Sequence, residues 1–196
     1  MNLPNKLTVL RVILVPAFMF FILFELPGGK GELLSRLIAA AVFSVASLTD
    51  YADGKIARKR GLITDFGKFM DPLADKFMIF GAIFAFAASP MYQQNAALRV
   101  GVIVSGTVVI FRELAVTSIR LVAASGEKPV VIAASWLGKA KTVSQIVYVL
   151  TLILEPLLFP FLHGALSWLT LAAMTVLTVV SGYDYIKTYW PYLSDK

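Results

Sequence analysis

Long apolar runs dominate this chain, and most of its charged residues lie between or at the ends of these runs. An α-helix needs roughly 20 mostly apolar residues to cross a bilayer core about 30 Å thick. Six runs approach this length, at residues 7–26, 33–48 and onward, 71–88, 98–124, 135–154 and 164–185. Turn-forming Pro and Gly residues separate them. The pattern predicts an all-α fold, an integral membrane bundle of six transmembrane helices, with a short lead-in helix at Pro4-Asn5. Residues 1–196 would form a single domain.

The composition agrees with this pattern and excludes several classes of protein. Of the 196 residues, 58% are hydrophobic and only 15% are charged. A soluble domain of this size is usually nearer one quarter charged, and a disordered chain is more polar still. The chain has no Cys and one His, which excludes a disulfide framework, a thiolate metal site and a His-rich zinc site.

The basic residues predict how the bundle is oriented. Six alternating spans place both termini on one side, together with the loops near residues 60 and 130. Of the 18 Lys and Arg residues, only Lys30, Arg36 and Arg99 fall on the opposite side. Cytoplasmic loops carry the excess of Lys and Arg in membrane proteins. We therefore expect a multi-pass protein of the cytoplasmic (inner) membrane, with both termini in the cytoplasm. A net charge of +6 without a basic soluble module favours anionic lipids or substrates over nucleic acid.

Four Asp residues lie at or near the predicted cytoplasmic ends of the second and third spans. Asp50 and Asp53 are three residues apart and Asp71 and Asp75 are four apart, so each pair shares one helix face. Carboxylates near the membrane are costly and are therefore functional candidates. Because four facing carboxylates repel one another, cations must lie between them. Oxygen ligands select Mg²⁺ or Mn²⁺, and two such ions suit displacement at phosphorus.

The residues around these carboxylates follow a pattern, Asp50-x2-Asp53-Gly54-x2-Ala57-Arg58-x8-Gly67-x3-Asp71-x3-Asp75. This pattern resembles the complete signature of the CDP-alcohol phosphotransferase family, whose six-helix membrane fold would cover nearly the whole chain. Three shorter stretches resemble the branch of the family whose acceptor is sn-glycerol 3-phosphate. They are Pro4-Asn5-x-Leu7-Thr8-x2-Arg11, Arg112-Glu113-Leu114 and Gly138-Lys139-x-Lys141-Thr142.

The resemblance implies roles for individual residues. Asp50, Asp53 and Asp71 would be metal ligands, and Asp75 would be both a metal ligand and the catalytic general base. The acceptor hydroxyl would attack the phosphorus attached to diacylglycerol, CMP would leave, and the enzyme would be a homodimer. The head group of CDP-diacylglycerol would be bound by Gly54, Ala57, Arg58, Thr64, Gly67, Asn5 and Thr8.

The phosphate of the acceptor needs cationic partners of its own. The candidates are Arg112, Arg120, Lys139 and Lys141, on the fourth and fifth spans. Arg112 is the strongest candidate because a guanidinium within a span needs an anionic partner. Its neighbour Glu113 points about 100° away around the helix, so it is not an automatic partner. Arg11 has two open interpretations: it lines the site, or its side chain extends to the membrane surface.

Two alternatives to this function stay open at the level of sequence. Within the family, the acceptor would be inositol phosphate, serine or phosphatidylglycerol instead of glycerol 3-phosphate. As a different class of protein, a small ion or solute transporter also has charged residues within its spans. In a transporter, polar residues would continue along the spans to the other face of the membrane. The outer halves of these spans are instead nearly all Phe, Leu, Ile, Val and Ala. This favours a pocket open on one side.

Overall fold

The computed structural model describes residues 2–60, 64–92, 95–125 and 135–190, with side chains except those of residues 51–60, 68, 124 and 125. In these ranges the chain forms six α-helices and two short 3-10 helices. They are α1 (Leu3–Leu23), α2 (Gly31–Arg60), α3 (Asp65–Ala88), η1 (Pro90–Tyr92), α4 (Ala96–Ser125), α5 (Trp136–Leu158), η2 (Pro160–Leu162) and α6 (Ala165–Tyr189). The prediction of an all-α fold is confirmed.

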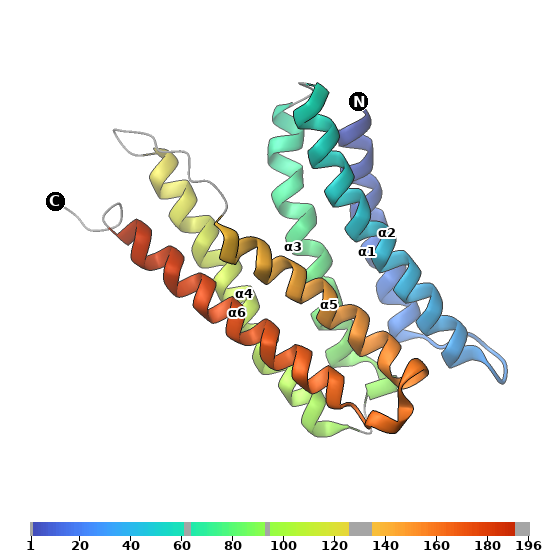
Figure 1. The fold of residues 1–196 in the computed structure, drawn as a ribbon. Coiled ribbons are helices and arrows are strands. Elements are labelled where there is room, and N and C mark those ends of the chain that lie inside the picture. The colour runs from blue at the N-terminus through green and yellow to red at the C-terminus, as the bar shows by residue number, and fades with distance from the viewer. Residues whose placement is uncertain (1, 61–63, 93–94, 126–134, 191–196) are drawn as a thin grey trace.

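The helices form two groups of three (Figure 1). In one group α1 packs against both α2 and α3, and in the other α6 packs against both α4 and α5. The groups are joined by contacts of α2 with α5 and of α3 with α4. They lie close together at the end that holds η1 and η2 and diverge toward the end where α1 begins and α6 finishes (Figure 1). The bundle therefore has a narrow end and a wide end.

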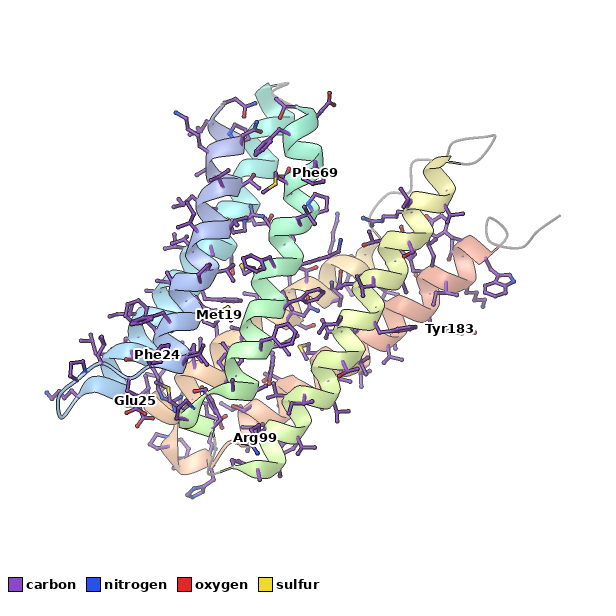
Figure 2. All side chains as sticks on the ribbon, turned by 180° about the vertical axis from the view of Figure 1, so that it is seen from behind. Met19, Phe24, Glu25, Phe69, Arg99 and Tyr183 are labelled. Atoms are coloured by element: carbon purple, nitrogen blue, oxygen red, sulfur yellow. The ribbon has the colours of Figure 1, made fainter. Side chains whose placement is uncertain are left out.

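The outer surface of the bundle is apolar, as a membrane protein requires. Within the described residues, α1, α2, α4, α5 and α6 are each long and apolar enough to cross a bilayer. Large side chains such as Phe69 and Tyr183 are exposed on this surface (Figure 2). Helix α3 has the length of a span, but its first turns are charged and its apolar run begins only at Phe77. The prediction of a multi-pass membrane protein is confirmed.

The N-terminal segment differs from the prediction in one respect. The lead-in helix is not a separate element, because α1 runs unbroken from Leu3 to Leu23 and includes it. Pro4 lies in the first turn, where its missing N–H leaves no hydrogen bond unmade. Asn2 is the N-cap, and its side-chain oxygen accepts from the Asn5 N–H at 3.1 Å. The Asn5 side chain is therefore available for tertiary contacts.

One face of α1 supplies both a polar and an apolar part of the interior. Near the wide end this face is polar, and toward the narrow end it continues as Val15, Phe18 and Ile22, all nearly inaccessible to solvent. Phe18 packs against Phe43 of α2 and Phe86 of α3, with ring centroids 5.4 and 6.2 Å apart. Such a buried aromatic cluster holds the three helices together and leaves the wide end for polar groups.

At the narrow end, a buried carboxylate caps α6 from the neighbouring helix. The N-cap of α6 is Gly164, which has no side chain to accept from the first N–H groups. Glu155 of α5 does this instead: its carboxylate accepts from the Leu166 N–H at 2.9 Å and from the Ser167 N–H at 2.7 Å. The Ser167 hydroxyl donates to the same carboxylate.

We expect Glu155→Ala to lower the melting temperature of the purified protein by about 2–10 °C. The substitution leaves buried N–H groups unpaired, which costs about 1–3 kcal/mol. Glu155→Gln, which keeps one acceptor oxygen, is expected to have a smaller effect. Glu25→Ala is the control, since Glu25 is exposed. A melting temperature of Glu155→Ala equal to that of Glu25→Ala would contradict this capping role.

Candidate active site

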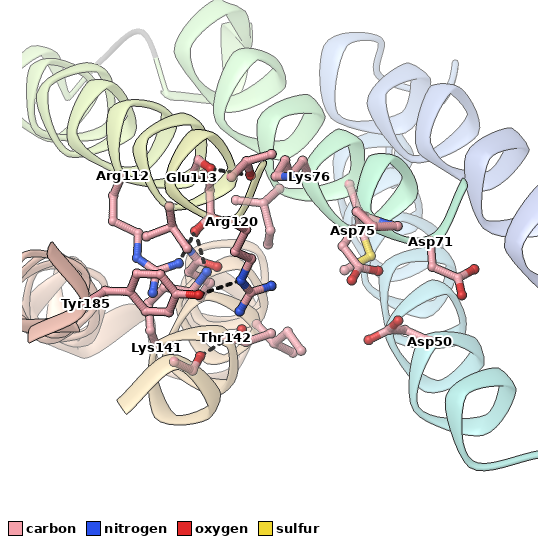
Figure 3. Close-up of a pocket in the computed structure, with 18 of the residues that line it drawn as sticks. Asp50, Asp71, Asp75, Lys76, Arg112, Glu113, Arg120, Lys141, Thr142 and Tyr185 are labelled. Atoms are coloured by element: carbon pink, nitrogen blue, oxygen red, sulfur yellow. Dashed lines mark hydrogen bonds and ion pairs between the residues drawn. The ribbon is translucent and has the colours of Figure 1, made fainter. Parts of the chain in front are cut away.

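A cavity of about 330 Å³ lies between the two helix groups on the side of the wide end (Figure 3). Its lining residues come from α2, α3, α4, α5 and α6. One wall, contributed by α2 and α3, is acidic on balance, with the carboxylates Asp50, Asp71 and Asp75 and one cation, Lys76. The opposite wall, on α4, α5 and α6, is mainly basic. The predicted carboxylates thus face the predicted cations across one cavity.

Arg11 of α1 connects the carboxylates of the acidic wall. Its side chain is fully buried, and its Nη1 lies 2.9 Å from Asp50 Oδ1 and 2.5 Å from Asp75 Oδ1. A single positive group between two carboxylates offsets their mutual repulsion, which is the role expected of a cation at such a site. Of the two interpretations that the sequence left open for Arg11, the structure therefore supports a place in the site. The side chain does not extend to the membrane surface.

The other polar residues of α1 reach α3. The Thr8 hydroxyl donates to Asp71 Oδ1 at 2.7 Å, and the hydroxyl of Thr64, the N-cap of α3, donates to Asn5 Oδ1 at 3.0 Å. Asn5, Thr8 and Arg11 are spaced by three residues, so they share one helix face. This face of α1 contacts all three carboxylates of the acidic wall, through Thr8 and Arg11, and the start of α3, through Asn5.

Gly67 lies where these groups converge. A Cβ atom at this position would come within 3.2 Å of Asn5 Oδ1 and 3.3 Å of Thr64 Oγ1, and 3.8 Å from Asp71 Oδ2. The absence of a side chain leaves a small space lined by polar oxygens. Asn5, Thr8, Thr64 and Gly67, four of the residues predicted to bind the CDP-diacylglycerol head group, are therefore close neighbours.

The basic wall is organised by one acidic residue, Glu113. Its Oε1 accepts from Arg112 Nη1 at 3.2 Å and also from Lys141 Nζ of α5 (Figure 3). The expectation that Glu113 is no automatic partner of Arg112 is wrong here. Although the two Cβ atoms diverge around the helix, both side chains are long enough to meet above it. Each of these three side chains is at least 85% buried.

Arg120 lies eight residues after Arg112 on α4 and contacts α6. Its Nε donates to the Tyr185 hydroxyl at 2.7 Å, and its guanidinium lies 5.5 Å from the centre of the Tyr185 ring.

Arg112 is accommodated by two glycines: a Cβ at Gly182 of α6 would come within 3.1 Å of its Cγ, and one at Gly138 of α5 within 3.9 Å of its Nη2. Small residues thus let three helices approach around the basic wall.

Lys139 lies apart from the other three predicted phosphate-binding residues. Arg112, Arg120 and Lys141 line the cavity, whereas Lys139 is exposed and lines a groove with Trp136, Val143 and residues of α6. Positions 139 and 141 are separated by about 200° around α5, so both cannot face the same cavity.

Four of the predicted residues lie outside the described side chains. Asp53, Gly54, Ala57 and Arg58 are in the last turns of α2, where only the helical backbone is described. Among the side chains that are described, no three acidic, His or Cys residues are grouped closely enough to hold a metal ion. Asp50, Asp71 and Asp75 nevertheless offer only carboxylate oxygens, which is the donor chemistry that fits Mg²⁺ or Mn²⁺.

Several residues of the cavity were not predicted from the sequence. They are Glu113 as a partner of two cations, Tyr185 as the acceptor of Arg120, and Gln145 in the lining. One signal was available for Gln145, because it follows Lys141 by four residues and so shares its helix face. No such signal existed for Tyr185, which lies 65 residues from Arg120.

Comparisons with known proteins agree on one family. The family described as CDP-alcohol phosphatidyltransferase matches residues 1–180. The CDP-diacylglycerol–glycerol-3-phosphate 3-phosphatidyltransferase of Bacillus subtilis is 40% identical, over 96% of this chain and 95% of its own length. A probable phosphatidylglycerophosphate synthase of Mycobacterium tuberculosis is 38% identical over 94% of this chain and 80% of its own length. The Escherichia coli CDP-diacylglycerol–glycerol-3-phosphate 3-phosphatidyltransferase is 33% identical over 89% of both. The chain therefore belongs to the CDP-alcohol phosphatidyltransferase family (CDP-alcohol phosphotransferases), the membrane enzymes whose signature its Asp residues resemble.

Proposed function

We propose that this enzyme transfers the phosphatidyl group of CDP-diacylglycerol to sn-glycerol 3-phosphate, giving phosphatidylglycerophosphate and CMP. The observation that carries the proposal is the cavity with an acidic wall facing a basic one. The basic wall suits an acceptor that carries a phosphate of its own, and serine lacks one. The names of the relatives in Bacillus subtilis and Escherichia coli point to the same acceptor.

Asp50, Asp53, Asp71 and Asp75 would hold two divalent ions, Mg²⁺ or Mn²⁺. Enzymes of this family generally depend on divalent metal ions. When bound, such ions polarise the phosphoryl group and stabilise the leaving oxygen of CMP. Arg11 competes for the same carboxylate oxygens through its contacts with Asp50 and Asp75, so we expect its side chain to move when metal binds.

Asp75 is the general base of the proposed reaction. Its carboxylate accepts the proton of the acceptor hydroxyl, whose oxygen then forms a bond to the phosphorus attached to diacylglycerol. The bond from that phosphorus to the CMP oxygen breaks, and CMP leaves with the electron pair. Gly67, Thr64, Asn5 and Thr8 would bind the CDP-diacylglycerol head group together with Gly54, Ala57 and Arg58. Arg58 would pair with the diphosphate through its guanidinium.

Arg112, Arg120 and Lys141 bind the acceptor phosphate in this proposal. Together they bring three positive charges to one wall, of which Glu113 neutralises one. Guanidinium groups bind phosphate oxygens through pairs of hydrogen bonds, and an ammonium group adds a point charge. Lys139 takes no part in this clamp, since its side chain is exposed on the other face of α5.

We further propose that the wide end faces the cytoplasm, with both termini and the cavity on that side. The excess of Lys and Arg in the flanking loops supports this orientation. It also puts the cavity where a water-soluble acceptor is available, while CDP-diacylglycerol reaches it from the bilayer. The resemblance to the family additionally supports a homodimer.

The proposal is tested with purified protein in detergent, CDP-diacylglycerol, Mg²⁺ and labelled sn-glycerol 3-phosphate. We expect equimolar CMP and lipid-soluble label, complete loss of both in the presence of a chelator, and recovery when Mg²⁺ or Mn²⁺ is added back. Inositol phosphate, serine and phosphatidylglycerol serve as competing acceptors. Absence of CMP with glycerol 3-phosphate, or faster release with another acceptor, would refute the proposed activity.

A further inference from the structure

Gln145 is a buried polar residue of the cavity that the proposed chemistry leaves without a role. It lies on α5, is only 2% exposed, and lines the cavity in the same wall as Lys141. Its Nε2 has no hydrogen-bond partner among the described residues. Gln145 is one helical turn beyond Lys141, on the same face and farther into the bundle.

An unpaired buried amide is unfavourable, because it has lost its hydrogen bonds to water without replacing them. Among the cations that line the cavity, Lys141 donates to Glu113 and Arg120 donates to Tyr185. Arg112 pairs with Glu113 through Nη1, although its Nε, like Gln145 Nε2, has no partner among the described residues. Polar side chains on the cavity surface that stay unpaired are suited to pair with a ligand. An unpaired amide in the lining of this cavity thus points to a hydrogen bond that forms when substrate binds.

The kind of group that Gln145 binds follows from its charge. The carboxylates of the cavity suit cations, and the guanidinium and ammonium groups suit phosphate. An uncharged amide, which donates through nitrogen and accepts through oxygen, suits a hydroxyl group, which also does both. A ligand whose phosphate contacts Lys141 extends along the same face of α5, so its hydroxyl groups come within reach of Gln145.

We propose that Gln145 is a specificity-determining residue that binds the secondary hydroxyl of the acceptor, the one that does not react. This inference rests on the proposed function, in which glycerol 3-phosphate is the acceptor and its primary hydroxyl attacks. Gln145 thereby distinguishes a glycerol phosphate from a shorter or deoxygenated alkyl phosphate. It also orients the primary hydroxyl, because the phosphate and the secondary hydroxyl then hold two of the three carbons of glycerol 3-phosphate.

The test compares sn-glycerol 3-phosphate with 3-hydroxypropyl phosphate, which keeps the phosphate and the primary hydroxyl but lacks the secondary one. For the unchanged enzyme, we expect kcat/KM to be about 10- to 100-fold higher with glycerol 3-phosphate, because the deoxy acceptor leaves the buried amide unpaired. In Gln145→Met, which has a similar shape and no amide, we expect this preference to fall to about twofold or less. The expected change is a lower rate with glycerol 3-phosphate, while the rate with the deoxy acceptor stays nearly constant.

Tyr148→Phe is the matched control. It removes another buried polar atom that has no partner among the described residues, on the same helix but not in the cavity lining, so the preference is expected to persist. Gln145→Asn, which keeps a polar group but shortens it, is the second variant in case Gln145→Met does not fold. Equal use of both acceptors by the unchanged enzyme overturns the inference, as does an equal loss with both acceptors in either variant. Failure of the proposed function itself is distinct, because the unchanged enzyme would then release no CMP with either acceptor.

Discussion

Asp75→Asn is expected to lower the rate of CMP release by about 10²- to 10⁴-fold, the contribution typical of a general base. The amide cannot accept the proton of the attacking hydroxyl, and it is a poorer ligand for a divalent ion. The protein is expected to fold, because Asp75 is half exposed at the cavity wall and Arg11 keeps its ion pair with Asp50. The measurement is the rate of CMP release at saturating CDP-diacylglycerol and metal.

Asp65→Asn provides the comparison for this variant. Asp65 lies on the same helix, is exposed and does not line the cavity, so its activity is expected to stay within about twofold of the unchanged enzyme. Equal melting temperatures of the two variants exclude misfolding as the cause of lost activity. Activity of Asp75→Asn comparable with that of Asp65→Asn would show that another group removes the proton.

Lys141→Ala is expected to raise the KM for glycerol 3-phosphate by about 10- to 100-fold, while the KM for CDP-diacylglycerol stays nearly unchanged. The substitution removes one positive charge from the basic wall and releases Glu113 from one of its two partners. Arg112→Ala is expected to act in the same direction. The measurement is the initial rate as a function of each substrate in turn.

Lys139→Ala tests whether Lys139 binds the acceptor phosphate, as the sequence suggested, or lies outside the site, as the structure indicates. Lys139 is only two residues from Lys141 but lines the outer groove of α5, so we expect the KM for glycerol 3-phosphate to be unchanged. If Lys139→Ala raised this KM as much as Lys141→Ala, both lysines would act on the acceptor. If neither Lys141→Ala nor Arg112→Ala raised it, the basic wall would not be the phosphate site.

The sequence predicted the six helices and the meeting of the carboxylates because these depend on local periodicity. Apolar runs of span length define the helices, and spacings of three and four residues put Asp71 beside Asp75 on one face. The placement of Asp50 with Asp75 rested on the predicted topology, since α2 and α3 are separate elements whose cytoplasmic ends are joined by one short loop. The lead-in helix was predicted as a separate element because Pro4 is compatible both with a helix start and with a break, whereas α1 runs unbroken from Leu3.

The contacts between elements distant in the sequence were beyond prediction. Arg11 contacts residues 39 and 64 positions away, and whether its guanidinium would reach the site or the membrane surface depends on how α1 packs. Lys139 and Lys141 are different: the geometry of an α-helix already places them on opposite sides of α5. The prediction grouped the two lysines because both are cationic, whereas their spacing along the helix correctly indicated that they face different sides.

The two walls of the cavity belong to different halves of the chain. The carboxylates and the polar face of α1 all precede Ala88, whereas Arg112, Lys141 and Gln145 all follow Ala96. In the proposed function, phosphoryl transfer and choice of acceptor therefore fall in separate, consecutive segments. On this proposal, substitutions in the second segment would change which alcohol receives the lipid phosphate, while the first segment would retain the reaction.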